Sequence, residues 1–270
     1  MRKSISILTL ACLVTAGALA SSGREHEALA RYRQSQMEFR EGNVQVLGPL
    51  VKGLESAVAR SPDNADLWEA LGNAYMSKLG VSYDSPTGPG ALIALAERAR
   101  SAYARALSFE KDNALLLASL GMADMALSSL RQDGPGLMKS VEEMNAAILR
   151  APNSTAVRLT RGFTIVNLPV GIRDTAAVKE DLTFLLGVAP GGRPEDVIHV
   201  LLGDVYAETG ALDDARREYE QVTGASRFAS EQARSRLAEL KKGAVSPASI
   251  GAVRANIGRC VMCHAPGTDN

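Results

Sequence analysis

The sequence predicts an all-α protein, built as a solenoid of antiparallel helix pairs and followed by a short C-terminal tail. Aromatic residues make up only 4% of the 270 residues and hydrophobic residues 46%. That balance favours helices over a β-sandwich or barrel, which needs Val, Ile, Tyr and Phe. Segments of helix length also recur with the same spacing of large and small residues. The tail differs from them, because it holds two closely spaced cysteines.

The overall charge gives no sign of a nucleic-acid or anionic-membrane partner. Lys and Arg number 30, and Asp and Glu also number 30. Binding to a polyanion normally requires a basic excess.

Residues 1–20 have the pattern of a secretory signal peptide. Arg2 and Lys3 precede an uncharged, mostly apolar run from Ser4 to Ala20, which ends in the small-residue pattern Ala18-Leu19-Ala20. We expect cleavage after Ala20, export to the periplasm and no membrane span after cleavage. The alternative is an uncleaved anchor, although the run is shorter than the ~20 residues of a typical span. The residues before Cys12 match a lipoprotein box poorly.

Cleavage would change the count of charges and cysteines. The mature chain would have 250 residues, 28 basic against 30 acidic side chains, and two cysteines, Cys260 and Cys263. The periplasm is oxidising, so a lone CxxC pair there calls for a chemical explanation.

The middle of the chain repeats a helix-pair pattern. Trp68, Leu71, Gly72 and Tyr75 stand at offsets 4, 7, 8 and 11 of one unit. A second unit carries the same kinds of residue at offsets 7, 8, 11, 15, 20 and 24: Leu202, Gly203, Tyr206, Gly210, Ala215 and Tyr219. These residues resemble the tetratricopeptide (TPR) family over roughly residues 25–242. The match is clear at 65–111 and 195–228, and less complete at 114–152 and 155–190.

The residue types have a physical reason. Small residues at offsets 8 and 20 stand where two antiparallel helices approach closely, and large residues at 4, 7, 11 and 24 fill the space between helices. We therefore expect a TPR-like solenoid over 21–242, closed by a charged, amphipathic capping helix. The expected helices are 24–40, 43–60, 65–79, 92–109, 114–130, 136–150, 155–167, 174–187, 194–208, 212–224 and 229–242.

Two insertions lengthen the predicted turns, Tyr83–Gly90 and Gln132–Gly136. They are either tolerated surface loops or contacts for a ligand or partner. The resemblance to TPR proteins implies a groove for a protein partner, here a periplasmic redox or envelope protein. No catalytic pattern is present, so we do not expect an enzyme.

The tail, residues 243–270, contains the motif Cys260-Val261-Met262-Cys263-His264, the CxxCH of c-type haem attachment. Two thiols at this spacing can reach both vinyl groups of one porphyrin edge, and the adjacent His can ligate the iron. Ser249 predicts a short helix over Ser249–Ile257 that runs into the motif. This stretch resembles the opening of a cytochrome c domain. The resemblance implies one covalent haem c, anchored by Cys260 and Cys263, with His264 as proximal ligand. Six residues follow His264 in this sequence, so we do not expect the tail to form a self-contained cytochrome fold.

Other interpretations of the cysteines remain open. They could form a small structural disulfide. They could also form a redox-active dithiol, because Arg259-Cys260-Val261-Met262-Cys263 is similar to the RCxxC of thiol-reducing cytochrome maturation proteins. A zinc site would need four ligands, and the motif supplies three at most.

The distal iron ligand is not predicted. The side-chain candidates are His26, His199, Met37, Met76, Met122, Met125, Met138, Met144 and Met262. His199 stands at a packing offset of its repeat, and Met122 and Met125 have the spacing of a helical core.

Two function hypotheses follow. In the first, the chain is a periplasmic TPR scaffold that carries one c-type haem for electron transfer with a docked partner. In the second, it is a non-redox adaptor for envelope complex assembly or cytochrome maturation, with Cys260 and Cys263 as a structural or redox-active pair.

Overall fold

The computed structural model describes residues 7–83, 87–188 and 191–250. Within these ranges the chain forms α-helices, one 3-10 turn and no strand. The elements are α1 (Ile7–Arg40), η1 (Val44–Val46), α2 (Leu47–Arg60), α3 (Ala65–Ser82), α4 (Pro89–Phe109), α5 (Ala114–Arg131), α6 (Gly134–Arg150), α7 (Thr155–Ile165), α8 (Thr175–Val188), α9 (Arg193–Glu208), α10 (Leu212–Glu220) and α11 (Arg227–Leu240).

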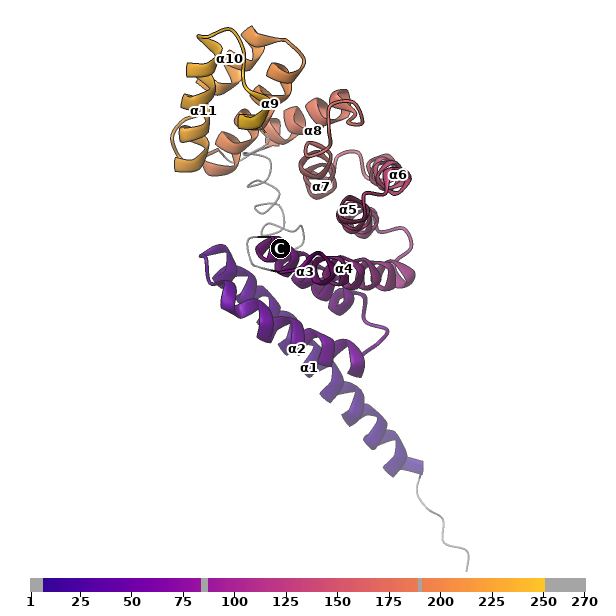
Figure 1. The fold of residues 1–270 in the computed structure, drawn as a ribbon. Coiled ribbons are helices and arrows are strands. Elements are labelled where there is room, and N and C mark those ends of the chain that lie inside the picture. Colours follow the sequence, from indigo (N-terminus) through magenta and orange to yellow (C-terminus); the bar gives the residue numbers. More distant parts are fainter. Residues whose placement is uncertain (1–6, 84–86, 189–190, 251–270) are drawn as a thin grey trace, which may run out of the picture.

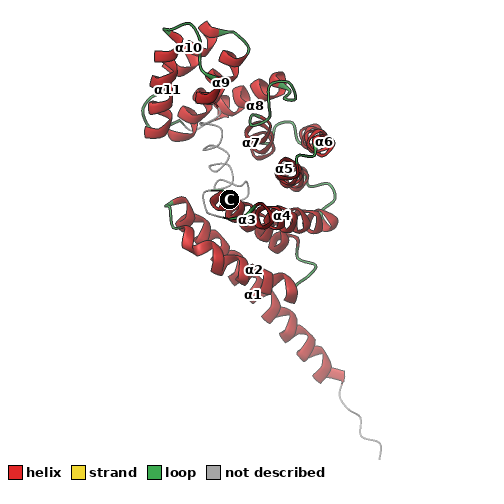
Figure 2. Ribbon diagram, in the orientation of Figure 1, coloured by secondary structure: helices red, strands yellow, loops and turns green. Residues whose placement is uncertain are grey.

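Consecutive helices pack as antiparallel pairs, and the pairs stack into an arc (Figures 1 and 2). The first helices of three pairs, α3, α5 and α7, lie toward the inside of the arc, and α4 and α6 lie outside it (Figure 1). Helix α11 packs on α9 and α10 and closes the stack. The predicted all-α, TPR-like solenoid is confirmed.

Several helix ends differ from the sequence prediction. The first helix begins at Ile7, well before residue 24, and the segment 43–46 is mostly a 3-10 turn. Helix α10 ends at Glu220, four residues early, because buried Asp196 accepts hydrogen bonds from the backbone amides of Thr223 and Ser226, both at 2.7 Å. Those bonds shape the turn, in which Gly224 has a positive φ of 100°.

Polar caps explain why many of the predicted starts are correct. Asn64 accepts a hydrogen bond from the amide of Leu67, and Asn113 does the same for Leu115 and Leu116. Asp133 caps α6 and makes it begin two residues earlier than predicted, and Ser154 caps α7. Each side chain satisfies amide groups that the helix itself leaves without a partner.

Glycines mark the closest approach within the helix pairs. A Cβ atom at Gly72 would lie 2.7 Å from the ring of Tyr103, and one at Gly203 would lie 2.4 Å from the ring of Tyr219. Gly121 is covered in the same way by Met144. These glycines stand at offset 8, where the sequence predicts a small residue, and the packing confirms the reason.

In the α7/α8 pair, a charged side chain packs against the glycine of the close helix approach. Gly162 has the glycine position, but the residue across from it is Asp181, whose side chain is completely buried. Arg161 donates to both carboxylate oxygens of Asp181, at 2.7 and 2.8 Å, and Arg158 adds a third bond of 2.9 Å. A buried carboxylate is tolerated in such a place only when it is fully paired.

Helix α5 has a composition and a length that would also suit a membrane span. It is the only helix of the described part that passes this test. Its buried residues, however, pack against α4, α6 and α7 in the middle of the stack. Core packing therefore accounts for its apolar character.

Candidate functional site

An apolar pocket lies on the inside of the arc, where α3, α5 and α7 stand next to one another. It has a volume of about 340 Å³. Its wall is formed by Met76 and Leu79 from α3, Met122 and Met125 from α5, and Phe163 from α7. The pocket therefore exists only because three successive helix pairs stack.

The lining contains no Asp, Glu, Lys or Arg side chain. Its polar members are few, and Asn167 is already engaged, since its side-chain amide donates to the carbonyl of Phe163 at 2.7 Å. Methionine is flexible and polarisable, and it adapts to apolar partners of different shapes. Such a lining can bind an apolar side chain or group.

Tyr83 is an exposed residue of the pocket lining. Its side chain is 46% exposed, although it lines the pocket. Partial burial raises the pKa of Tyr83 above its ordinary value. The insertion Tyr83–Gly90 thus begins at a residue of the pocket lining.

The start of the tail is fastened to the capping helix. Glu239 accepts hydrogen bonds from the backbone amide of Ser246 and the hydroxyl of Ser249, both at 2.6 Å. Arg236 donates to the carbonyl of Ser249 at 2.7 Å, and Ile250 is buried. The chain is therefore held against α11 up to ten residues before Cys260.

Electrostatics reinforce this fastening. Burial alone would raise the pKa of Glu239, but the bonds from Ser246 and Ser249 and the charge of Arg236 lower it. Arg236 is itself fully buried and pairs with Asp204 at 3.0 Å. The predicted helix capped by Ser249 is wrong in register: the described helical turn is 247–250, and Ser246 precedes it. Pro247 explains the shift, since proline fits the first helical position.

The residues predicted to attach haem, Cys260, Cys263 and His264, lie outside the described residues, as does Met262. In the part of the chain that is described, no three His, Cys, Asp or Glu side chains are grouped to hold a metal ion.

The other candidate ligands lie in four different environments. His26, Met37 and Met138 are exposed on the surface. His199 is mostly buried between α9 and α10, with Nδ1 2.8 Å from Oε2 of Glu218, as the packing interpretation predicts. Met144 is completely buried.

Met76, Met122 and Met125 meet in the pocket described above. Sequence reasoning assigned Met122 and Met125 to the core, which their burial confirms, but it missed the pocket that they line. A signal was available, because Met76 and Met125 both stand at offset 12 of their units.

Comparison with known proteins supports the fold. No protein-family model and no curated protein matches the chain. Among solved structures, the chain is similar to TTC0263, a thermophilic TPR protein of Thermus thermophilus. The TM-score is 0.56 at 15% sequence identity, over 80% of this chain and 99% of that one. The likeness extends to the fold, so this chain has a TPR-like architecture.

Proposed function

We propose that this chain is an exported docking scaffold that receives an apolar segment of a partner protein in the pocket of α3, α5 and α7. The observation that carries the proposal is the uncharged, methionine-rich lining, which suits an apolar side chain. The fold supports it, since stacked helix pairs create extended concave binding surfaces.

The second part of the proposal is redox chemistry. Cys260 and Cys263 would anchor one haem c and His264 would ligate its iron, so that the docked partner exchanges an electron through the haem edge. The support is the CxxCH spacing together with the signal-like N-terminus, and both are features of the sequence. Because Ser249 is bonded to Arg236 of α11 and Ile250 is buried, the motif would start from a fixed point of the scaffold.

A scaffold without haem is the alternative, with the two cysteines as a disulfide or a redox-active dithiol. Intact mass and the visible spectrum separate the two. The chain is exported in a host with a haem-attachment system and purified. The redox proposal predicts the mass of residues 21–270 plus one haem, and the reduced α-band of a c-type cytochrome. Both should disappear in the Cys260→Ser, Cys263→Ser double variant.

The docking part can be tested separately with the apolar dye ANS as the probe. We expect saturable fluorescence enhancement by the wild-type chain. Ala126→Trp, which fills the pocket, and Tyr83→Ala, in its lining, should weaken binding about fivefold or more. Phe109→Ala is the matched control, because Phe109 is 39% exposed but lies outside the pocket. Equal binding by all four chains would contradict docking at this pocket.

A further inference from the structure

The structure narrows the choice of a distal ligand for the haem iron, which the sequence alone leaves open. The apolar shell around a metal site controls how far solvent reaches it. Three of the candidate side chains lie on the surface and lack such a shell: His26, Met37 and Met138.

Two further candidates are buried but already engaged. The ring of His199 has a carboxylate near each nitrogen, with Glu218 2.8 Å from Nδ1 and Glu195 3.8 Å from Nε2. Met144 is completely buried against Gly121 and does not line the inner pocket. Met262 stands between the two anchoring cysteines, on the side of the ring that the adjacent histidine of the motif would take.

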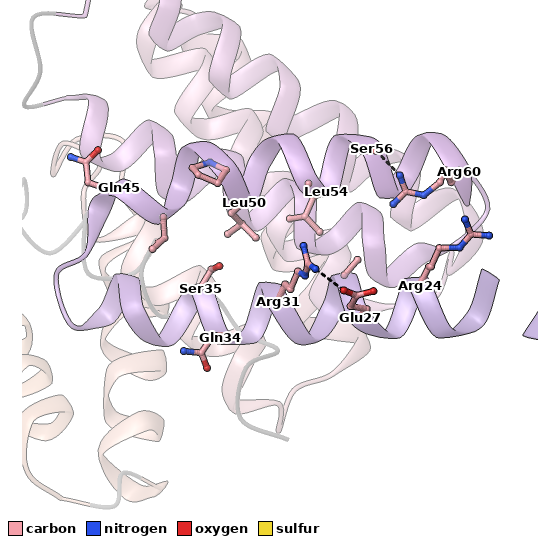
Figure 3. A pocket seen from close by; sticks show the side chains of 14 residues that line it. Arg24, Glu27, Arg31, Gln34, Ser35, Gln45, Leu50, Leu54, Ser56 and Arg60 are labelled. Atoms are coloured by element: carbon pink, nitrogen blue, oxygen red, sulfur yellow. Dashed lines mark hydrogen bonds and ion pairs between the residues drawn. The ribbon is translucent and has the colours of Figure 1, made fainter. Parts of the chain in front are cut away.

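A groove between α1 and α2 is larger than the inner pocket, with a volume of about 690 Å³ (Figure 3). On its α1 side Arg31 pairs with Glu27 at 2.6 Å. The described residues that line this groove include no His, Met, Cys or Tyr. It therefore offers no side chain of the kinds that ligate haem iron.

The pocket of α3, α5 and α7 offers three thioethers. Met122 and Met125 stand three residues apart, on one face of α5, and Met76 comes from α3. Each is only 3–6% exposed, although it lines the pocket. Methionine pairs with histidine on the iron of many c-type haems, and the uncharged lining would shelter the bond. These residues therefore fit the group.

The motif is close enough to the pocket along the chain. Ser249 accepts a bond from Arg236 of α11, and Cys260 follows Ile250 by ten residues, which span at most about 36 Å when extended. In the stack, α11 packs on α9, α9 on α8, and α8 on α7, whose Phe163 lines the pocket. Packed helices lie about 8–10 Å apart, so these three steps amount to about 30 Å at most.

We infer that the pocket supplies the distal iron ligand, from Met76, Met122 or Met125, opposite His264. The inference rests on the haem part of the proposed function. Covalent anchoring removes the need for a deep haem cavity, so an open pocket that presents a thioether is sufficient. A partner segment docked in the same pocket would compete with this bond, which would couple docking to the ligation of the iron.

Visible spectroscopy of the loaded chain tests the bond. The chain is exported in a host with a haem-attachment system, purified and oxidised. Methionine on iron(III) gives a long-wavelength charge-transfer band, and it raises the reduction potential. We expect the band in the wild type. The triple variant Met76→Leu, Met122→Leu, Met125→Leu should lose it and have a lower potential, and the three single variants identify the ligand.

Matched controls make the result specific. Leu conserves the volume of Met, so the variants should fold, which circular dichroism checks. Met144→Leu should keep the band, because Met144 is as buried as the other three but lies outside the pocket lining. A band retained by the triple variant, or absent from the loaded wild type, would overturn the inference. If the triple variant does not fold, retention of the band by all three single variants overturns it. A chain without the mass of a haem would instead refute the redox part of the proposed function, and the inference with it.

Discussion

Gly203→Ala is the sharpest test of how the helix pairs pack. The added Cβ would lie 2.4 Å from Cε1 of Tyr219, where about 3.5–4.0 Å is normal. The ring cannot withdraw easily, because Tyr219 is 1% exposed and its hydroxyl donates to Asp204 at 2.7 Å. Overpacking of this kind costs about 1–3 kcal/mol, and the better helix propensity of Ala returns up to about 1. We expect a net loss of about 1–2 kcal/mol.

Urea denaturation followed by circular dichroism at the helical band measures the loss, with the slope of the transition checked for each variant. Gly53→Ala is the control: its Cβ meets nothing within 4 Å, so we expect a gain of about 0.5–1 kcal/mol. In a Tyr219→Leu background the Gly203→Ala cost should shrink, because the two residues are in contact. Equal or greater stability of Gly203→Ala than wild type would refute the packing argument.

Three further predictions concern charged groups. Burial, with Asp66 and Glu110 nearby, raises the pKa of Glu69 to about 7, so the folded state holds the proton more tightly than the unfolded state does. The free energy of unfolding should therefore fall as pH rises from about 4.5 to 7. Urea midpoints measured across this range should show a smaller fall in Glu69→Gln. The pKa of Glu239 is lowered, so the stability that its carboxylate contributes should be lost on acidification. Glu239→Gln should speed hydrogen exchange of the Ser246 amide about tenfold at neutral pH. An unchanged exchange rate would contradict the hydrogen bonds that hold the tail to α11. Asp181→Asn leaves two buried arginines poorly paired and should cost about 3–5 kcal/mol in the same urea assay, whereas a loss under about 1 would contradict the role of that carboxylate.

The fold could be predicted from the sequence because each repeat has large and small residues at fixed offsets. Gly72 and Gly203 were expected at close helix approaches, and the rings of Tyr103 and Tyr219 cover them. The α7/α8 pair was harder to predict. Asp181 lies where the other pairs have a large side chain across from the glycine, and its partners Arg158 and Arg161 come from the neighbouring helix. The end of α10 also differs from the prediction because Asp196 of another helix bonds to Thr223 and Ser226.

The two candidate sites differ in how far the sequence alone predicts them. The CxxCH motif is local, so its spacing alone predicts haem chemistry for Cys260, Cys263 and His264. The apolar pocket brings together residues as distant in sequence as Met76 and Phe163, and only the stacking of three pairs unites them. A repeated Met at offset 12 was the one trace of it in the sequence.

The central claim is that a docking scaffold carries a covalent haem on its C-terminal motif. Its most direct test is the intact mass of the exported, purified chain. The account predicts residues 21–270 plus a single haem, with the addition mapped by peptide mass analysis to the fragment that holds Cys260 and Cys263. A colourless chain of unmodified mass, produced alongside a fully loaded control cytochrome, would contradict it.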